Sequence, residues 1–250
     1  MSKLADAIRR SQRVDSAPMG FGAARPAAKV TMLVGSIGPA GDVSSARDAG
    51  AGFIVIDARG GSFDADAARS AREQAGDVPL GAWTSVADSA AAAALREAGL
   101  DFLIVDGDAP ASGLLNEELG YVLALPVQPD ETYLRSLDPL ELEALLLPAV
   151  PSPLTVGGQI ELSRAGAITR RPLLCDAVPS ASQDDLMCLR AAGVVAVLTS
   201  TSGVSALKES VAALPPRKAR REERAVVSLP RGQAASNDHD DDDDDLAVRN

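Results

Sequence analysis

The sequence predicts an α/β fold, a single (β/α)8 TIM-like barrel, and three observations support this prediction. Between residues 29 and 214, short apolar segments alternate eight times with segments of helical composition. Several of the apolar segments lack polar positions altogether, as expected of parallel strands that are covered on both faces. A glycine suited to the left-handed end of a helix precedes three of them, at Gly50, Gly99 and Gly193.

Residues 95–110 show the repeated pattern in its clearest form. Residues 95–98 end a helix, Gly99 stops it, and the run Phe-Leu-Ile-Val at 102–105 reads as a buried strand. Acidic residues then follow the strand at Asp106 and Asp108. Because this order of features recurs along the chain, we interpret each occurrence as the junction between one βα unit and the next.

Each predicted strand is followed by a predicted helix. The strands are 29–34, 53–57, 79–84, 102–106, 121–125, 142–147, 172–176 and 194–199. The helices are 43–49, 65–74, 88–98, 113–119, 131–136, 154–165, 182–192 and 204–213. Residues 35–39 are predicted as the loop that ends the first strand, because glycine and proline punctuate them. The alanine run in 88–98 favours a helix, whereas the leucines and glutamates of 142–147 would also suit one.

The alternation alone also fits an open, doubly wound sheet. Two features favour a closed barrel. Gly50 and Gly99 are 49 residues apart, and Gly99 and Gly193 are 94 apart, close to twice that spacing, which indicates a repeat of two units. The dinucleotide-binding fingerprint of an open sheet is also missing, because residues 35–38 lack its glycine spacing.

The two ends of the chain differ from the barrel. Residues 1–28 are predicted as a short helix and a connector, with Leu4, Ile8 and Val14 on one side of the helix, and we expect a lid on the bottom of the barrel. A helix that binds a membrane surface or a partner is the alternative. Residues 215–250 are predicted as a disordered tail, basic and then rich in aspartate, because like charges repel one another. Such a tail aids solubility; cation buffering and docking on a basic partner are alternatives.

Composition narrows the classes of function. The chain has 250 residues, 46% of them hydrophobic and 3% aromatic, which predicts an aliphatic core. A net charge of −11 argues against nucleic-acid binding. No apolar run reaches the length of a membrane span, and no targeting segment is recognisable. Cys175 and Cys188 stand apart from each other, as in a reducing compartment, so we expect a cytoplasmic protein. The oligomeric state stays open.

Residues 171–200, RPLLCDAVPSASQDDLMCLRAAGVVAVLTS, resemble the last two units of the phosphate- or flavin-binding TIM barrels. That superfamily includes thiamine-phosphate synthase, indole-glycerol-phosphate synthase and nitronate-monooxygenase-like proteins. More loosely, the chain resembles uncharacterised bacterial barrels with an N-terminal helix and a charged tail. The resemblance implies a barrel with an anion site at its last two loops. Two positions depart from the pattern, because residues 177–179 replace a Gly-Gly turn and residues 199–203 replace a single Gly-Ser.

The eighth loop keeps donors for an anion. Hydroxyl groups and a glycine at a helix start suit phosphate binding. The residues of this predicted ligand or anion site are Thr199, Ser200, Thr201, Ser202 and Gly203. Ordinary capping of the last helix by Ser202 or its neighbours is the alternative explanation.

Polar residues follow several predicted strands, and the active sites of TIM barrels lie where the strands end. Asp57, Asp106 and Asp176 are the predicted catalytic carboxylates, because carboxyl groups in different environments can act as acid and base. The predicted substrate contacts at the same end are Arg59, Trp83 and Gln128. An aspartate after a strand also caps turns, which is the structural alternative.

Missing residue types exclude several reactions. The one histidine, His239, stands in the aspartate run of the tail, which argues against a histidine base, a Ser-His-Asp triad or histidine-bound zinc in the barrel. No lysine ends a predicted strand, so Schiff-base chemistry is not expected. The catalytic lysines of indole-glycerol-phosphate synthase and the histidine of nitronate monooxygenase are missing as well. No metal site is predicted; Mg²⁺ and FMN stay open as cofactors.

These observations predict an enzyme of lyase or isomerase type that acts on a small polar or phosphorylated metabolite by carboxylate acid–base chemistry. The alternative is a non-catalytic, degenerate barrel that serves as a scaffold or binds a partner. The two differ in geometry. Converging aspartates around an open pocket would favour the enzyme, whereas a mouth closed by Trp83, Pro126 and Pro148 would favour the scaffold.

Overall fold

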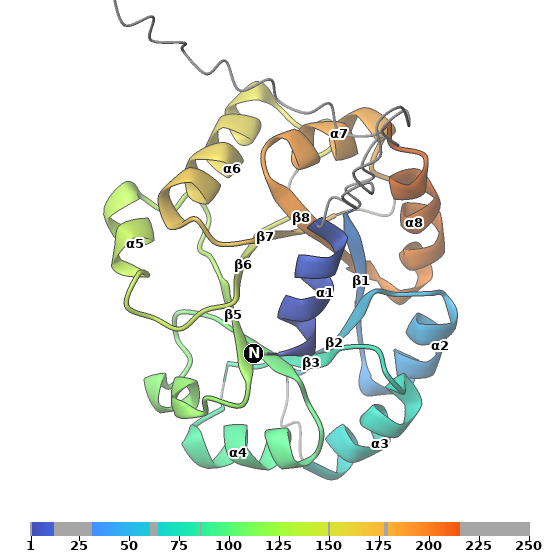
Figure 1. Cartoon of the computed structure of the whole chain (residues 1–250), viewed down its shortest axis with the longest axis vertical. Coiled ribbons are helices and arrows are strands. Elements are labelled where there is room, and N and C mark those ends of the chain that lie inside the picture. The colour runs from blue at the N-terminus through green and yellow to red at the C-terminus, as the bar shows by residue number, and fades with distance from the viewer. Residues whose placement is uncertain are drawn as a thin grey trace, which may run out of the picture. The chain divides into compact units, whose positions relative to one another are not determined.

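A computed structural model describes residues 2–12, 32–60, 65–85, 87–149, 151–177 and 180–215. Within these residues, eight parallel strands form a closed barrel in which each strand pairs with the next and the last pairs with the first (Figure 1). Leu33 pairs with Ala196 and Ile37 pairs with Ser200, so the two ends of the barrel sequence lie side by side. The predicted (β/α)8 barrel is therefore confirmed, and the open sheet is not observed.

The elements follow one another as predicted in nearly every unit. The strands are β1 (Leu33–Gly38), β2 (Phe53–Asp57), β3 (Leu80–Trp83), β4 (Phe102–Val105), β5 (Gly120–Ala124), β6 (Ala144–Leu147), β7 (Leu173–Asp176) and β8 (Val194–Ser200). The helices are α1 (Lys3–Gln12), α2 (Val43–Asp48), α3 (Ala65–Ala75), α4 (Ser89–Glu97), α5 (Glu131–Ser136), α6 (Val156–Thr169), α7 (Gln183–Ala191) and α8 (Val204–Ala212). Short 3-10 turns are η1 (Ala40–Asp42), η2 (Ala111–Leu115) and η3 (Thr201–Gly203).

Two predicted elements are wrong in place or type. The first strand was expected at 29–34 but lies at Leu33–Gly38, so most of it falls in the stretch 35–39 that was predicted as a loop. Gly35 is the reason, because a side chain at this position would overlap the ring of Phe53 on β2. The glycine therefore provides room for a ring inside the barrel and does not mark a turn. The helix predicted at 113–119 is only the 3-10 turn η2, which follows β4.

The barrel interior is filled by large side chains opposite glycines. Phe53 and Phe102 meet edge to face, with 6.3 Å between ring centroids. Phe102 occupies the space left by Gly81, as Phe53 does at Gly35. Aliphatic side chains of the other strands complete this inner cluster, which makes the barrel a packed core and not a pore.

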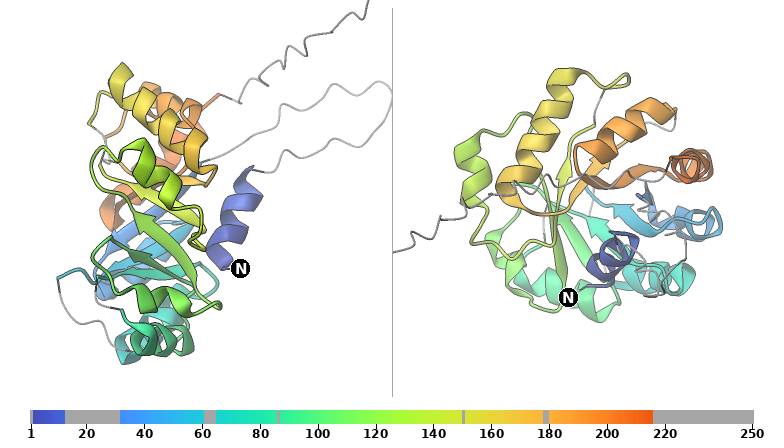
Figure 2. Two further views of the ribbon diagram at one scale, coloured as in Figure 1. Left: turned by 90° about the vertical axis from the view of Figure 1, so that its left-hand side faces the viewer. Right: turned by 45° about the horizontal axis from the view of Figure 1, so that its top comes forward.

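Helix α1 covers the end of the barrel at which the strands begin. Leu4 and Ile8 are buried in the same inner cluster as the two phenylalanines. The backbone N of Ser2 donates to Glu143 Oε1 at 2.8 Å, just ahead of β6. Figures 1 and 2 show α1 lying across this end. The predicted lid is confirmed, and the carboxyl ends of the strands are thus at the opposite end of the barrel.

The predicted helix-ending glycines adopt the left-handed conformation. The φ angles are 81° at Gly50, 98° at Gly99 and 96° at Gly193. Several predicted features lie outside the described residues: the connector after the first helix, Val14, the turn residues 178–179, His239 and the charged tail. Among the helices that the structure describes, none combines the length and the apolar character needed to traverse a lipid bilayer.

Candidate active site at the carboxyl ends of the strands

The alternation of each strand decides which side chains reach the mouth of the barrel. On β2, Phe53 and Val55 face the interior, and on β7 Leu174 does so. Because side chains two positions apart share a face of a strand, Asp57 and Asp176 point toward the barrel axis at the ends of these strands. The same rule brings Trp83 to the mouth from β3 and Asp106 from the end of β4.

Arg59 is the centre of the cluster that forms there. Its Nε donates to Asp57 Oδ1 at 2.9 Å and its Nη2 donates to Asp57 Oδ2 at 2.7 Å. Its guanidinium also lies over the indole ring of Trp83, 4.1 Å from the ring centroid. A carboxylate at one edge and an aromatic face below hold the guanidinium in one orientation.

Two carboxyl groups of this mouth have pKa values shifted in opposite directions. The hydrogen bonds from Arg59 lower the pKa of Asp57, and partial burial offsets part of this effect. Burial raises the pKa of Asp176, and the positive charge of Arg59 offsets part of that effect. Arg59 thus interacts with both groups, one with a lowered pKa and one with a raised pKa. Such a pair of environments is how proteins separate the roles of acid and base.

Asp106 has a structural role in the loops. Ser85 Oγ donates to Asp106 Oδ2, and the backbone N of Asp108 donates to Asp106 Oδ1 at 3.1 Å. Oδ2 therefore stabilises the segment that follows β3, and Oδ1 stabilises the segment that follows β4. Sequence reasoning missed Ser85, although its position two residues beyond Trp83 places it on the same face of the strand.

Trp83 forms part of the floor of the mouth. Its ring packs against the inner cluster, and its Nε1 is buried with no hydrogen-bond partner among the described residues. Pro126 and Pro148, which were expected to close the mouth in a scaffold protein, are exposed to solvent. They line a groove of about 530 Å³ between α5 and α6. Gln128 lies in the same groove, with an unusual φ of 56°.

The residues predicted to bind an anion divide into two groups. Ser200 and Ser202 are exposed, with 3.2 Å between their hydroxyl oxygens. Thr201 Oγ1 lies 3.0 Å from Ser36 Oγ on β1. Thr199 faces the outer layer because Leu198 faces the interior, and its buried hydroxyl has no partner among the described residues. Gly203 is buried and immediately precedes α8.

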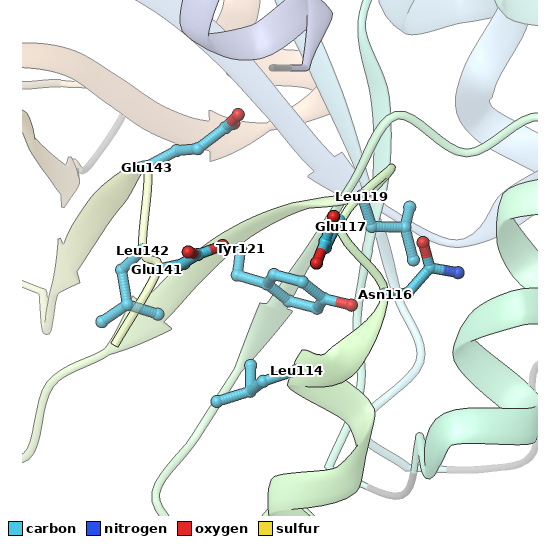
Figure 3. Close-up of a pocket in the computed structure, with 8 residues that line it drawn as sticks. All are labelled: Leu114, Asn116, Glu117, Leu119, Tyr121, Glu141, Leu142 and Glu143. Atoms are coloured by element: carbon cyan, nitrogen blue, oxygen red, sulfur yellow. The ribbon is translucent and has the colours of Figure 1, made fainter. Parts of the chain in front are cut away.

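A second cavity, of about 260 Å³, lies at the opposite end of the barrel beside the start of β5 (Figure 3). Tyr121 lies among its lining residues, and its hydroxyl donates to the carbonyl of Gly113 at 2.6 Å. Three glutamates line the walls, and one of them, Glu143, is bonded to Ser2. These bonds stabilise the lid and the loop. Within the described ranges, no group of histidine, cysteine or acidic side chains is arranged to hold a metal ion.

No protein-family model matches the sequence, and no curated protein matches it. Solved structures match its fold. Phosphoribosyl anthranilate isomerase from Thermus thermophilus is 18% identical, with a TM-score of 0.54 over 72% of this chain and 98% of that chain. The 3-keto-L-gulonate-6-phosphate decarboxylase from Vibrio cholerae is 12% identical, with a TM-score of 0.58 over 74% and 100%. An HpcH/HpaI aldolase from Desulfitobacterium hafniense is 11% identical, with a TM-score of 0.54 over 76% and 96%.

At these identities the likeness shows the fold alone. It supports the TIM-barrel fold and does not single out the thiamine-phosphate synthase, indole-glycerol-phosphate synthase or nitronate-monooxygenase families. The neighbours are enzymes of isomerase, decarboxylase and aldolase type.

Proposed function

We propose that the protein is an enzyme of lyase or isomerase type that acts on a small anionic metabolite at the mouth of the barrel. The observation that carries the proposal is the position of Arg59, which is paired with Asp57, stacked on Trp83 and close enough to influence Asp176. Two of the matching structures are named for phosphorylated compounds, which favours a phosphorylated substrate.

Each residue of the cluster has a distinct role in this proposal. Arg59 binds a carboxylate or an enolate oxygen of the substrate, because a planar guanidinium recognises such groups in two-point fashion. Asp57 orients Arg59. Asp176 transfers the proton, because a carboxyl group with a raised pKa exchanges a proton closer to neutral pH than an ordinary aspartate does. The charge that develops on the substrate next to Asp176 is stabilised by Arg59.

A second anionic group of the substrate would bind at the end of β8. Asp176 pairs in register with Leu198, so Ser200 lies two residues further along the neighbouring strand. The exposed hydroxyls of Ser200 and Ser202 lie next to each other and ahead of α8. They provide donors for a phosphate at the end of the barrel where Asp176 acts.

A thermal-shift screen followed by proton exchange tests this function. Small phosphorylated and carboxylic metabolites are screened with and without Mg²⁺, and FMN is included. Compounds that stabilise the protein are then incubated in D2O, where ¹H NMR follows the loss of a carbon-bound proton. We expect exchange with the wild-type protein and at least about 100-fold slower exchange with Asp176→Asn.

Arg47 provides a matched control for the anion-binding role of Arg59. It forms a similar exposed pair with Asp48 on α2, outside the mouth. Arg59→Gln should remove the thermal shift caused by the ligand, whereas Arg47→Gln should keep it. Binding that survives Arg59→Gln, or exchange that survives Asp176→Asn, would contradict the proposal. A screen without any stabilising compound would favour the scaffold alternative.

A further inference from the structure

Asp185 joins two consecutive units of the barrel. It lies in the first turn of α7 and is only 8% exposed. Its Oδ1 accepts a hydrogen bond from the backbone N of Leu154 at 2.8 Å, and its Oδ2 accepts one from Ser152 Oγ at 2.6 Å. Both donors belong to the loop between β6 and α6, more than 30 residues earlier in the chain. The carboxylate therefore connects this loop to the following helix.

The N-cap of α7 is Ser182, and hydrogen bonds with Ser182 are minor causes of the lowered pKa of Asp185. Ser182 caps α7, because its hydroxyl accepts from the backbone N of Asp185 at 3.1 Å. Asp184, the neighbour of Asp185, is exposed and already places a negative charge in the first turn. Burying a carboxylate is costly unless hydrogen bonds compensate for the lost water. The bonds to the β6–α6 loop provide that compensation, and the bond from Leu154 is the main cause of the lowered pKa of Asp185.

The loop that Asp185 holds also forms a wall beside Asp176. A small cavity of about 20 Å³ is lined by Asp176 and Ala177 at the end of β7 and by Ser152 and Leu154 of the loop. Asp185 lines the same cavity. Burial is the main cause of the raised pKa of Asp176, and this loop is one of the segments that lie beside its carboxyl group.

We propose that Asp185 is a positioning residue that keeps the β6–α6 loop closed against Asp176 and thereby excludes solvent from this group. The inference rests on the proposed function in so far as Asp176 is the acid–base residue there. The charged group that acts on Asp176 is Arg59, which is paired with Asp57 on the β2 side, and Asp185 of α7 faces the same small cavity. Asp185 acts through the loop and not by contact with the substrate.

Two substitutions at Asp185 separate its hydrogen bonds from its charge. In Asp185→Asn the side chain oxygen still accepts from Leu154, and its nitrogen can donate to Ser152 Oγ. In Asp185→Ala both bonds are lost. Asp184→Ala is the matched control, because it removes a carboxylate from the same turn without touching the loop.

The readouts are amide exchange at Leu154 and the pKa of the Asp176 carboxyl, measured by NMR on the full chain without substrate. In Asp185→Ala we expect exchange at Leu154 to become about tenfold faster or more, and the pKa of Asp176 to fall toward the ordinary aspartate range. Asp185→Asn should keep exchange within about threefold of wild type. Asp184→Ala should change neither quantity.

If amide exchange at Leu154 is unchanged in Asp185→Ala, Asp185 does not hold the β6–α6 loop and the proposal is overturned. If the pKa of Asp176 stays raised in Asp185→Ala, the β6–α6 loop does not keep solvent from the Asp176 carboxyl group, and this part of the proposal is overturned. If Asp185→Ala fails to fold, Ser152→Ala removes one of the two bonds, and it should give a smaller change of the same sign in both readouts. Because no substrate is involved, these outcomes are independent of whether the proposed enzyme activity is found.

Discussion

The guanidinium of Arg59 lies 4.1 Å from the centroid of the Trp83 ring, and Trp83 is the one tryptophan of the sequence. The intrinsic fluorescence of the protein therefore reports on a single place, the mouth of the barrel. Any change in the position or partner of Arg59 alters the electric field at this indole. This relationship gives a direct optical measure of the candidate site without knowledge of the substrate.

The first prediction concerns how the Asp57–Arg59 ion pair, and with it the fluorescence emission of Trp83, depends on pH. Because the pKa of Asp57 is lowered, the pair contributes stability above the unfolded pKa of aspartate, and this contribution is lost as the pH falls through the folded value. In Asp176→Asn, which removes the titration of the second carboxyl group that acts on Arg59, emission should stay constant from pH 7 down to about pH 4 and change below it. In Asp57→Asn the emission should differ from wild type at neutral pH already. Emission of the Asp176→Asn variant that changes between pH 7 and 5 would contradict this account.

The second prediction concerns the cost of a buried acid. Burial raises the pKa of Asp176, so its contribution to stability is present below the unfolded pKa and lost as the pH rises through the folded value. Asp176→Asn removes the ionisation and should raise Tm at pH 7. At about pH 3 the difference should vanish. Calorimetry at both pH values measures the difference in Tm between the variant and the wild type. A Tm of Asp176→Asn below that of the wild type at pH 7 would contradict the prediction.

The third prediction concerns the glycines inside the barrel. A methyl group at Gly81 would overlap the ring of Phe102. Gly81→Ala should lower the free energy of unfolding by about 1–3 kcal/mol through overpacking. Gly41→Ala is the control, because nothing lies within 4 Å of the added carbon. Urea denaturation of both variants compares them, and equal effects would show that the interior can rearrange around Phe102.

The sequence predicted the number and order of the units because helix-ending glycines and apolar strands are local features. It misplaced β1 because Gly35 looks like a loop residue until Phe53, 18 positions later, is packed against it. It predicted that Asp57, Arg59, Trp83 and Asp176 lie at one end of the barrel, because side chains at strand ends must meet once the barrel closes. The chemical roles of these four residues could not be predicted, because they depend on distances between loops that are far apart in the sequence. The same applies to Asp185, whose partners are far away in the sequence.

The fourth prediction concerns the lid. Leu4 is fully buried in the inner cluster, and Leu4→Ala should reduce the free energy of unfolding by about 2–5 kcal/mol. Lys3→Ala is the control, because the Lys3 side chain is exposed and its pair with Asp101 at 3.6 Å is worth about 1 kcal/mol or less. Chemical denaturation compares the two variants. A Leu4 variant as stable as wild type would show that α1 is not part of the folded core.

The last prediction separates stability from anion binding at the end of β8. The Thr199 hydroxyl is buried without a partner in the part of the chain that the structure describes, which costs about 1–3 kcal/mol. Thr199→Val keeps the shape and removes the hydroxyl, so it should maintain or raise Tm. The thermal shift caused by inorganic phosphate should not change, because the exposed hydroxyls are those of Ser200 and Ser202. Ser200→Ala combined with Ser202→Ala should weaken that shift instead. If Thr199→Val lowers Tm or removes the response to phosphate, the hydroxyl has a partner in solution, and the anion site extends below the surface to the outer face of β8.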